Sequence, residues 1–565
     1  MKITGAEILA RSLIANGITH AFNVPGLGLH PLVDALKRHR DSIEYFTGPS
    51  ETAVTVMADG YGRAAGRPAF VNLYHASGTA LGMLGVNTAW ADRSPMIFTT
   101  TTSSRRLERR DQYASVPGDI TETTRQFTKW SWQVPMAARI PEAIARAVIM
   151  ATTPPFGPVH LAFPMDIYAE EVEEDELASA LMARPERLQV FSAASADPQG
   201  IRQAADLLRS SARPLIVAGG DVAQHGAVEE LVALAESLDA AVLGEPYVAY
   251  MGFPNDHRLF AGRFSPASPL VEQADVILAV GAEFTETAPL SNAPPADSKI
   301  VFMTTDPLDF GKQIWADVGL LGHPKTSLTA LRRELQALGH GAARTEWASE
   351  INARRTDYRG RLAEEIGKDR DATPIRIPRL IKEVEKVFGT EAVILDHSTT
   401  GTACMLQMYD FPDPTRYFGL SARASAQGWG VPAAMGMQIA RPDQRVVAFA
   451  GDGGFMFTAN ALHAAALWRL PLVIIVLSNG GWHDVAYGAQ KNRGWTDEEI
   501  RDFGWVPEPP IDYAGLATSL GVSAQKVEAP GELPGALARA RDARGPILLE
   551  VRSDPKAVEY YLAWQ

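Results

Sequence analysis

Short apolar runs alternate with longer amphipathic segments along most of the chain. Near the N-terminus the capping-box pattern Thr4–Glu7 precedes an apolar face at helical spacing, formed by Ile8, Leu9, Leu13 and Ile14. Gly17 then stands where a helix would end. A second helix is predicted from about Ser50 to Gly66, among apolar runs of strand length at 18–23, 69–74, 96–100 and 159–163. Such alternation predicts a parallel sheet covered by helices on both faces.

Two further units repeat this alternation. Their strand-like runs lie at 214–218, 275–280 and 299–303, and then at 392–395, 446–450 and 472–477. An acidic and then Ala/Ser/Pro-rich stretch at 170–198 predicts a solvated linker, and a polar helical stretch at 344–376 predicts a connector. We therefore expect an α/β protein of three consecutive domains, at 1–175, 190–340 and 365–555, each with a central parallel sheet flanked by helices.

Composition and charge narrow the class of protein. Hydrophobic residues make up 46% of the 565 positions, which is typical of a globular chain. The 53 Lys and Arg against 66 Asp and Glu leave a net charge of −13, which argues against a nucleic-acid partner. The single cysteine, Cys404, excludes intrachain disulfides and multi-cysteine metal sites. No apolar run approaches the ~20 residues that span a bilayer, and residues 1–4 lead straight into a helix, so we expect no membrane segment, no signal peptide and a cytoplasmic location.

One loop of the third unit carries candidate chemistry. The strand 446–450 runs into Gly451-Asp452-Gly453-Gly454, and Asn479 follows the next strand. Glycines and a helix N-terminus favour a bound anion, while Asp and Asn oxygens suit Mg²⁺ beside phosphates. Adjacent parallel strands would bring Asp452 and Asn479 to one edge of the sheet. By itself Gly-Asp-Gly also describes an ordinary turn.

The first unit places a carboxylate, Glu51, in the first turn of the predicted helix. It stands in Pro49-Ser50-Glu51-Thr52-Ala53, and Met57-Ala58-Asp59-Gly60-Tyr61-Gly62-Arg63 and Gly66-Arg67-Pro68 follow. A surface carboxylate stabilised by the helix dipole is the alternative interpretation of Glu51.

Taken together, these motifs resemble those of the thiamine-diphosphate enzymes, in the group of acetolactate synthase, benzoylformate decarboxylase and 2-hydroxyacyl-CoA lyase. The pattern pairs Glu-Thr-Ala-x4-Ala-Asp-Gly-Tyr-Gly-Arg-x2-Gly-Arg-Pro in the first unit with Gly-Asp-Gly-x26-Asn in the third. Further matches are Asn87-Thr88-Ala89-Trp90 with Ser94-Pro95, 127–130 and 428–434. The resemblance covers nearly the whole chain and implies pyrimidine-binding, middle and diphosphate-binding domains, in that order.

The resemblance also implies a cofactor and its ligands. Thiamine diphosphate would lie between the first domain of one subunit and the third of another, which makes a homodimer the minimal unit and a homotetramer the expected one. Mg²⁺ ligands would be Asp452, Asn479 and the Gly481 carbonyl; diphosphate contacts would come from Thr399, Thr400, Gly451, Gly453 and Gly454. Gln427 would wedge the cofactor into its bent shape, and Glu51 would hydrogen-bond the aminopyrimidine.

Several positions depart from the relatives. Leu27 replaces a serine of benzoylformate decarboxylase, and 281–285 lacks that enzyme's histidine, which argues against a simple benzoylformate decarboxylase. Ala114 and Ser115 replace bulkier residues and indicate a roomier pocket. Asp306 stands where relatives hold the adenosine part of FAD or ADP. Glu286 replaces the basic residue of the flavin-binding relatives, which argues against FAD, so ADP or FAD in the middle domain stays an open alternative without support.

Other polar residues have two interpretations each. His75, after the strand 69–74, could shuttle protons or be a structural histidine. The same holds for His30, His397 and His483. The cluster Arg105, Arg106, Arg109 and Arg110 could bind a carboxylate or a coenzyme A phosphate, or lie on a solvated surface.

The expected activity is therefore cleavage or formation of a C–C bond beside a carbonyl, with thiamine diphosphate and Mg²⁺. The leading expectation is a reaction like that of acetolactate synthase, in which a 2-oxo acid is decarboxylated and its acyl unit is transferred to a second carbonyl. A 2-hydroxyacyl-CoA lyase and a non-catalytic cofactor-binding homologue are the alternatives; Glu51 argues against the latter because a sensor needs no activating acid.

Overall fold

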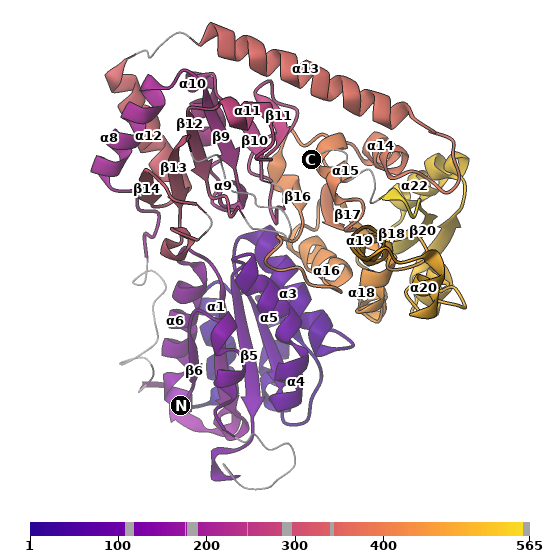
Figure 1. Ribbon diagram of the computed structural model, residues 1–565. Helices are drawn as coiled ribbons and strands as arrows, with labels where there is room; N and C mark the ends of the chain where they lie inside the picture. The colour runs from indigo at the N-terminus through magenta and orange to yellow at the C-terminus, as the bar shows by residue number, and fades with distance from the viewer. Residues whose placement is uncertain are drawn as a thin grey trace.

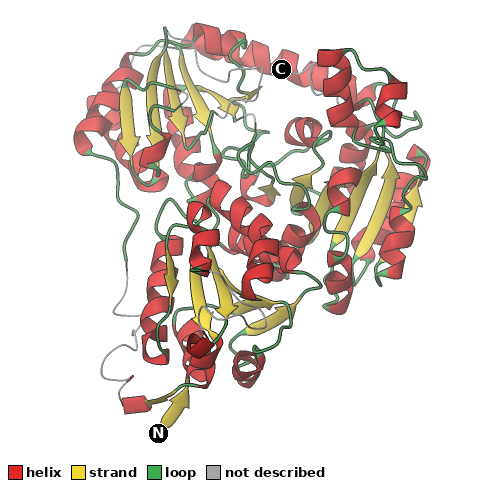
Figure 2. Ribbon diagram, turned by 60° about the horizontal axis from the view of Figure 1, so that its bottom comes forward, coloured by secondary structure: helices red, strands yellow, loops and turns green. Residues whose placement is uncertain are grey.

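Three sheets, each of six parallel strands, organise the protein. The computed structural model describes residues 1–107, 118–175, 177, 190–245, 247–284, 297–312, 314–339 and 344–557. Helices cover both faces of each sheet (Figures 1 and 2). The α/β expectation is confirmed, with parallel pairing throughout the three sheets.

The first sheet has the strand order β3-β2-β4-β5-β7-β6. Its strands are β2 (His20–Asn23), β3 (Glu44–Thr47), β4 (Ala69–Tyr74), β5 (Met96–Thr102), β6 (Ser131–Gln133) and β7 (Pro158–Pro164). The helices around it are α1 (Gly5–Ala15), α2 (His30–Arg38), α3 (Glu51–Ala65), α4 (His75–Leu81), α5 (Met83–Ala91) and α6 (Ile140–Thr152).

The second sheet has the order β11-β10-β9-β12-β13-β14. Its strands are β9 (Pro214–Ala218), β10 (Ala241–Gly244), β11 (Phe260–Arg263), β12 (Val276–Val280), β13 (Lys299–Thr304) and β14 (Val318–Leu321). Its helices are α8 (Pro198–Ser210), α9 (Gly220–Gln224), α10 (Val228–Leu238), α11 (Pro269–Gln273) and α12 (Pro324–Leu338). The long helix α13 (Thr345–Gly367) then runs along one side of the molecule to the third sheet (Figure 1).

The third sheet has the order β16-β15-β17-β18-β20-β19. Its strands are β15 (Val393–His397), β16 (Tyr417–Phe418), β17 (Val446–Gly451), β18 (Val473–Ser478), β19 (Ser523–Val527) and β20 (Ile547–Arg552). Its helices are α14 (Ile377–Phe388), α15 (Thr402–Met408), α16 (Gly430–Ala440), α17 (Asp452–Met456), α18 (Ala461–Leu467), α19 (His483–Arg493), α20 (Asp497–Asp502), α21 (Tyr513–Ser519) and α22 (Leu533–Asp542).

The helix ends follow local chemistry. The Ser50 hydroxyl caps α3 by accepting from the Ala53 N–H, and Gly66 ends it at φ +64° in the left-handed region. At α1, Thr4 accepts from the Glu7 N–H, but the predicted reciprocal bond is replaced, because the Glu7 carboxylate binds Arg11, Arg38 and His39 instead. Only half of that capping box forms.

The acidic stretch after the first sheet is a partial exception to the expected linker. Within it, β8 (Glu171–Glu173) pairs antiparallel with β1 (Lys2–Thr4). Val172 is buried in this pair while Glu171 and Glu173 face solvent. The pattern of acidic residues alone gave no sign of a strand, because the partner lies at the other end of the unit.

Helices α3 and α16 join the first and third units at very close range. A Cβ added to Gly436 would lie 1.9 Å from the Met57 carbonyl oxygen, and one added to Gly60 would lie 2.1 Å from that of Ala433. The two backbones therefore approach each other where neither helix carries a side chain. One hydrophobic core continues through this crossing, with Tyr61, Trp429 and their neighbours buried in it.

Candidate functional site

A cavity of about 370 Å³ opens at the carboxyl ends of the third sheet's strands. The chain leaves β15 toward β16 on one side and returns to β17 on the other, so the strand order reverses at this point. Ligands of open α/β sheets bind at such a reversal. The cavity is lined by Tyr247, Asp396, His397, Thr399, Thr400, Thr402, Tyr417, Leu420, Ser421, Ala422, Ser425, Ala426, Gln427 and Asp484.

Asp452 lies directly after β17, as the first residue of α17. Its side chain is buried, and burial raises its pKa to about 6 even though backbone N–H groups oppose the shift. One carboxylate oxygen accepts from the N–H of Gly453 at 2.8 Å, and the other accepts from Asn479 at 3.1 Å and Gly480 at 2.9 Å. The two predicted loops therefore meet at one edge of the sheet.

The oxygens gathered here fit a hard divalent cation. Asn479 Oδ1 accepts from the Gly481 N–H at 3.2 Å, which holds that amide beside the Asp452 carboxylate. Carboxylate, amide and carbonyl oxygens are the donors that Mg²⁺ takes next to a phosphate. In the described part of the chain no cluster of three or more His, Cys, Asp or Glu side chains could hold a metal ion, so any such site relies on neutral oxygens as well.

The residues beside Asp452 form a backbone cradle. A Cβ on Gly454 would lie 2.6 Å from Gln427 Oε1, and a Cβ on Gly453 would lie 2.9 Å from the Trp482 ring. Thr399 has φ +56°, a strained value for a β-branched residue that is typical of functional loops. The cradle thus brings together Gln427, the two glycines and the 399–400 loop, and it fits a diphosphate that needs close backbone approach.

His397 lines the cavity and also supports this cradle. Its Nε2–H donates to the Ala426 carbonyl at 2.9 Å, and burial lowers its pKa. The ring is therefore neutral and holds the residue before Gln427 in place.

The first sheet carries Glu51 and His75 at its own strand reversal, between β2 and β4. His75 follows β4 and begins α4; Glu51 begins α3 and is half-buried. A Cβ on Gly78 of α4 would lie 3.3 Å from Glu51 Oε1, so the two helix starts are neighbours. Neither residue is among those lining the third-sheet cavity of the same chain.

His75 is a buried residue in an unusual backbone conformation. Its φ is +80°, its side chain is buried, and within the described structure its Nε2 has no hydrogen-bond partner. Burial lowers its pKa, so the ring is neutral near pH 7. Strain combined with an unpartnered nitrogen is more typical of a site residue than of a structural histidine.

The remaining candidates fall elsewhere. Arg105 has a structural role, because its guanidinium binds Asp166 at 2.7 Å and Glu170 at 2.6 Å. Leu27 is 63% exposed and His30 begins α2 on the surface. The predictions that concern Arg109, Arg110, Ala114, Ser115 and Glu286 lie outside the described residues.

The second sheet's strand reversal, between β9 and β12, does not fit a nucleotide. The buried Arg93 of the first unit enters it and binds Asp221 at 3.2 Å, Asp309 at 2.5 Å and Asp306 at 3.3 Å. The cavity that the described residues leave there is about 20 Å³. Glu245 and Glu283 line this cavity, and burial raises the pKa of both carboxyls.

Sequence reasoning missed several cavity residues. Tyr247 reaches the cavity from the second unit, while Asp396, Tyr417, Ser421 and Asp484 belong to the third. Asp396 directly follows the predicted apolar run 392–395, much as Asp452 follows 446–450, so the sequence did carry a signal for it. Asp484 stands in a polar segment with no repeat or spacing that marks it, and Tyr247 could be placed only by tertiary packing.

Comparison with known proteins gives matches along nearly the whole chain. Three family models match in order: the N-terminal TPP binding domain, the central domain and the C-terminal TPP binding domain of thiamine pyrophosphate enzymes, over residues 3–123, 201–331 and 399–551. A benzoylformate decarboxylase of Pseudomonas aeruginosa is 32% identical, covering 96% of this chain and 97% of its own. A probable acetolactate synthase large subunit of Methanococcus aeolicus is 28% identical, with coverages of 98% and 93%.

A solved structure agrees. The thiamine diphosphate-dependent 4-hydroxybenzoylformate decarboxylase of Rhodococcus jostii superposes with a TM-score of 0.82 at 25% identity, covering 98% of this chain and 99% of that one. No helix among the described residues is long and apolar enough to cross a membrane. With its three matched domains and its glycine-flanked Asp452 at the edge of the third sheet, the chain belongs to the thiamine pyrophosphate enzymes and is an enzyme of that kind.

Proposed function

We propose that this enzyme uses thiamine diphosphate and Mg²⁺ to decarboxylate a 2-oxo acid and transfer the acyl unit to a second carbonyl. The observation that carries the proposal is the meeting of Asp452 and Asn479 at the cradle formed by Thr399, Gln427 and Gly454. When bound, the cofactor supplies a nucleophilic carbon and an electron sink for C–C bond cleavage.

Residues of the chain itself would hold the cofactor and its metal ion and would move protons. Asp452, Asn479 and the Gly481 carbonyl would hold Mg²⁺ against the diphosphate, with Thr399, Thr400, Gly451 and the following glycines as N–H and O–H donors. Gln427 would press on the thiazolium from the cavity wall. Glu51 Oε1 would hold a proton against the pyrimidine nitrogen, and the neutral His75 Nε2 would accept or return a proton at the substrate.

A second copy of the chain would complete the site. In one chain the rim that carries Glu51 and His75 is separate from the third-sheet cavity. Both regions expose large apolar side chains, namely Leu27, Leu81, Phe457, Trp482 and Val485. Such exposure favours burial at an interface. We therefore propose a homodimer in which each cavity faces the partner subunit's first sheet. Because members of the family are usually oligomeric, we propose that two such dimers form a homotetramer.

The substrate class separates decarboxylation from thioester cleavage. The benzoylformate decarboxylase relative supports a 2-oxo acid, although Leu27 and the 281–284 segment still depart from that enzyme's pattern. A 2-hydroxyacyl-CoA lyase of Arabidopsis thaliana is 26% identical, covering 98% of this chain and 96% of its own. Arg105 argues against a coenzyme A substrate, because its guanidinium already binds Asp166 and Glu170.

Proton NMR of the purified protein with thiamine diphosphate and Mg²⁺ tests the proposal. The panel holds pyruvate, benzoylformate, branched 2-oxo acids and short 2-hydroxyacyl-CoA thioesters. We expect loss of a 2-oxo acid and appearance of an aldehyde or a hydroxyketone. Consumption of a thioester alone would replace the proposal by the lyase, and saturable cofactor binding with no turnover of any member would favour the non-catalytic homologue.

A further inference from the structure

One irregular segment forms much of the cavity wall. Residues 419–427 lie between β16 and α16 without regular structure, and six of them line the cavity: Leu420, Ser421, Ala422, Ser425, Ala426 and Gln427. Ser425 has φ +32°, which a non-glycine residue adopts only when its surroundings hold it. The segment therefore depends on contacts from outside itself.

The first of these contacts comes from the end of α5 in the first unit. The buried Asp92 carboxylate accepts a hydrogen bond from the Ser421 hydroxyl through one oxygen, and from Arg63 Nη1 at 2.8 Å through the other. The Ser421 carbonyl in turn accepts from the N–H groups of Ala424 and Ser425, each at 3.2 Å. Asp92 thus holds the residue on which the turn closes.

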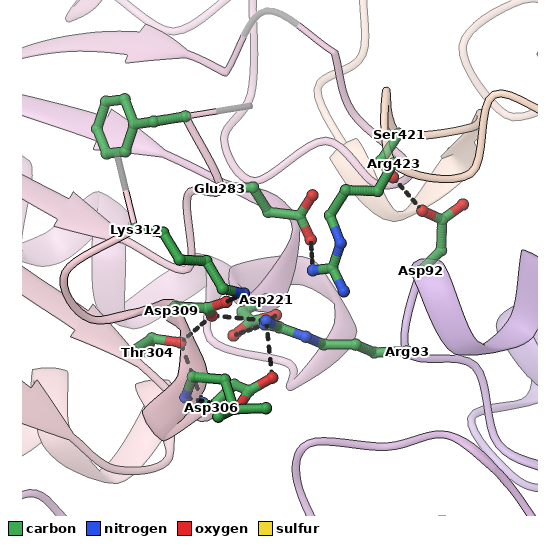
Figure 3. A network of polar contacts seen from close by, with 12 residues as sticks. Asp92, Arg93, Asp221, Glu283, Thr304, Asp306, Asp309, Lys312, Ser421 and Arg423 are labelled. Carbon is green, nitrogen blue, oxygen red and sulfur yellow. Dashed lines mark hydrogen bonds and ion pairs between the residues drawn. The ribbon is translucent and has the colours of Figure 1, made fainter. Parts of the chain in front are cut away.

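The second contact comes from the second unit. Arg423 Nη1 donates to Glu283 Oε1 at 2.7 Å, and its guanidinium lies 5.5 Å from the Trp90 ring centroid. Glu283 is itself held, because its N–H donates to Glu245 Oε1 at 2.5 Å. Figure 3 shows the Arg423–Glu283 pair beside the Asp92–Ser421 bond, on the same side of the network.

The neighbouring residue, Arg93, keeps the two anchoring units together. Its guanidinium binds Asp221, Asp306 and Asp309 of the second unit (Figure 3). Asp92 and Arg93 are adjacent residues at the end of α5. Asp92 bonds to the third unit, and Arg93 bonds to the second. Movement of either unit would be transmitted to the cavity wall.

We infer that Asp92 and Glu283 are positioning residues, which set the geometry of segment 419–427 from two different units. The inference rests on the proposed function, because the wall that they hold is the proposed cofactor cavity. Neither side chain needs to touch the cofactor. A displaced wall would weaken cofactor binding and misplace Gln427, and small displacements at a reacting centre have large effects on rate.

Two substitutions remove the anchors one at a time. Ser421→Ala removes the bond to Asp92, and Arg423→Gln removes the ion pair with Glu283; both leave the pairs of Arg63 and Arg93 intact. Arg423→Lys restores the charge. Lys312→Gln is the matched control, because Lys312 Nζ pairs with Asp309 at 3.3 Å in the same network but does not touch the segment.

Hydrogen–deuterium exchange of the protein without cofactor is the first readout, since it does not depend on activity. We expect segment 419–427 to exchange about tenfold faster in Ser421→Ala and Arg423→Gln, to recover in Arg423→Lys and to stay unchanged in Lys312→Gln. Exchange across β17 and β18 should match wild type in all four, which shows that they are folded. Wild-type exchange of the segment in both Ser421→Ala and Arg423→Gln would overturn the inference.

Thiamine diphosphate affinity with Mg²⁺, measured by tryptophan quenching, is the second readout. We expect about tenfold weaker binding in Arg423→Gln, which lies outside the cavity lining, and recovery in Arg423→Lys. Unchanged affinity in Arg423→Gln would also count against the inference. Failure of the wild-type protein to bind the cofactor would instead refute the proposed function, while the exchange result would still decide whether the two anchors hold the segment.

Discussion

The indole Nε1–H of Trp429 donates a 2.8 Å hydrogen bond to Oδ2 of Asp59, and both side chains are completely buried. Arg63, which binds the same carboxylate at 2.9 Å, lies 4.7 Å from the Trp429 ring centroid. Asp59 belongs to α3 of the first unit, and Trp429 directly precedes α16 of the third. One carboxylate thus ties together the helix that begins at Glu51 and the segment that carries Gln427.

Asp59→Ala should strongly destabilise the protein. It leaves the buried Arg63 guanidinium with a single carboxylate, that of Asp92, and loss of a buried partner costs about 3–5 kcal/mol. Urea unfolding measures the change. Arg541→Ala, which breaks the exposed pair with Asp542, is the control and should leave the midpoint unchanged. Similar midpoints for the two variants would contradict the role given to Asp59.

Gly436→Ala should lower the free energy of unfolding by about 1–3 kcal/mol, because the new methyl group would overlap the Met57 carbonyl at the helix crossing. Gly360→Ala, in the middle of α13 with nothing within 4 Å of the added Cβ, is the matched control. It should stabilise the protein by about 0.5–1 kcal/mol. If both substitutions shifted the melting temperature in the same direction, the close approach of α3 and α16 would be wrong.

Glu51→Gln should abolish turnover, by at least about 100-fold, since an amide cannot exchange the proton that a carboxyl can. Steady-state rates with the substrate found by NMR measure the loss. The unfolding midpoint should stay near wild type, and cofactor affinity should fall far less than turnover, because Glu51 does not line the cavity that carries the diphosphate cradle. Activity retained within a few-fold would refute the assigned role.

His160 should make stability fall with acid. Its ring is buried between the hydroxyls of Thr100 and Thr124, at 2.9 and 2.7 Å, and burial lowers its pKa from 6.5 to about 3. The unfolded chain therefore binds a proton below pH 6.5 that the folded protein rejects. His160 alone therefore lowers the free energy of unfolding by up to ~1.4 kcal/mol for each pH unit of acidification between about pH 6 and pH 3.

His160→Gln tests that pH dependence. The amide can bond both hydroxyls but does not titrate, so the free energy of unfolding should depend less steeply on pH between 6.5 and 4.5 than in wild type. Chemical denaturation at several pH values gives the two slopes. Equal slopes would show that the histidine is not kept neutral.

Much of the fold followed from local pattern. The ten apolar runs predicted three or four strands of each sheet to within one or two residues, but not the interior strands β10 and β20. Ser50 and Gly66 marked both ends of α3, because caps act between near neighbours in sequence. Edge strands such as β16, with two residues, and β11 gave no comparable signal, since their pairing depends on the rest of the sheet.

The sequence by itself determined the α/β units, the glycine-flanked Asp452, the first-turn Glu51 and, through their joint pattern, the family. Only the tertiary structure decided that β8 closes against β1, that Arg93 fills the second sheet's crevice, and that Tyr247 and Asp484 reach the cavity. The physical reason is sequence separation. A strand end or a cap is specified by residues a few positions apart, whereas Asp92 and Ser421 meet across 329 positions through packing of whole units.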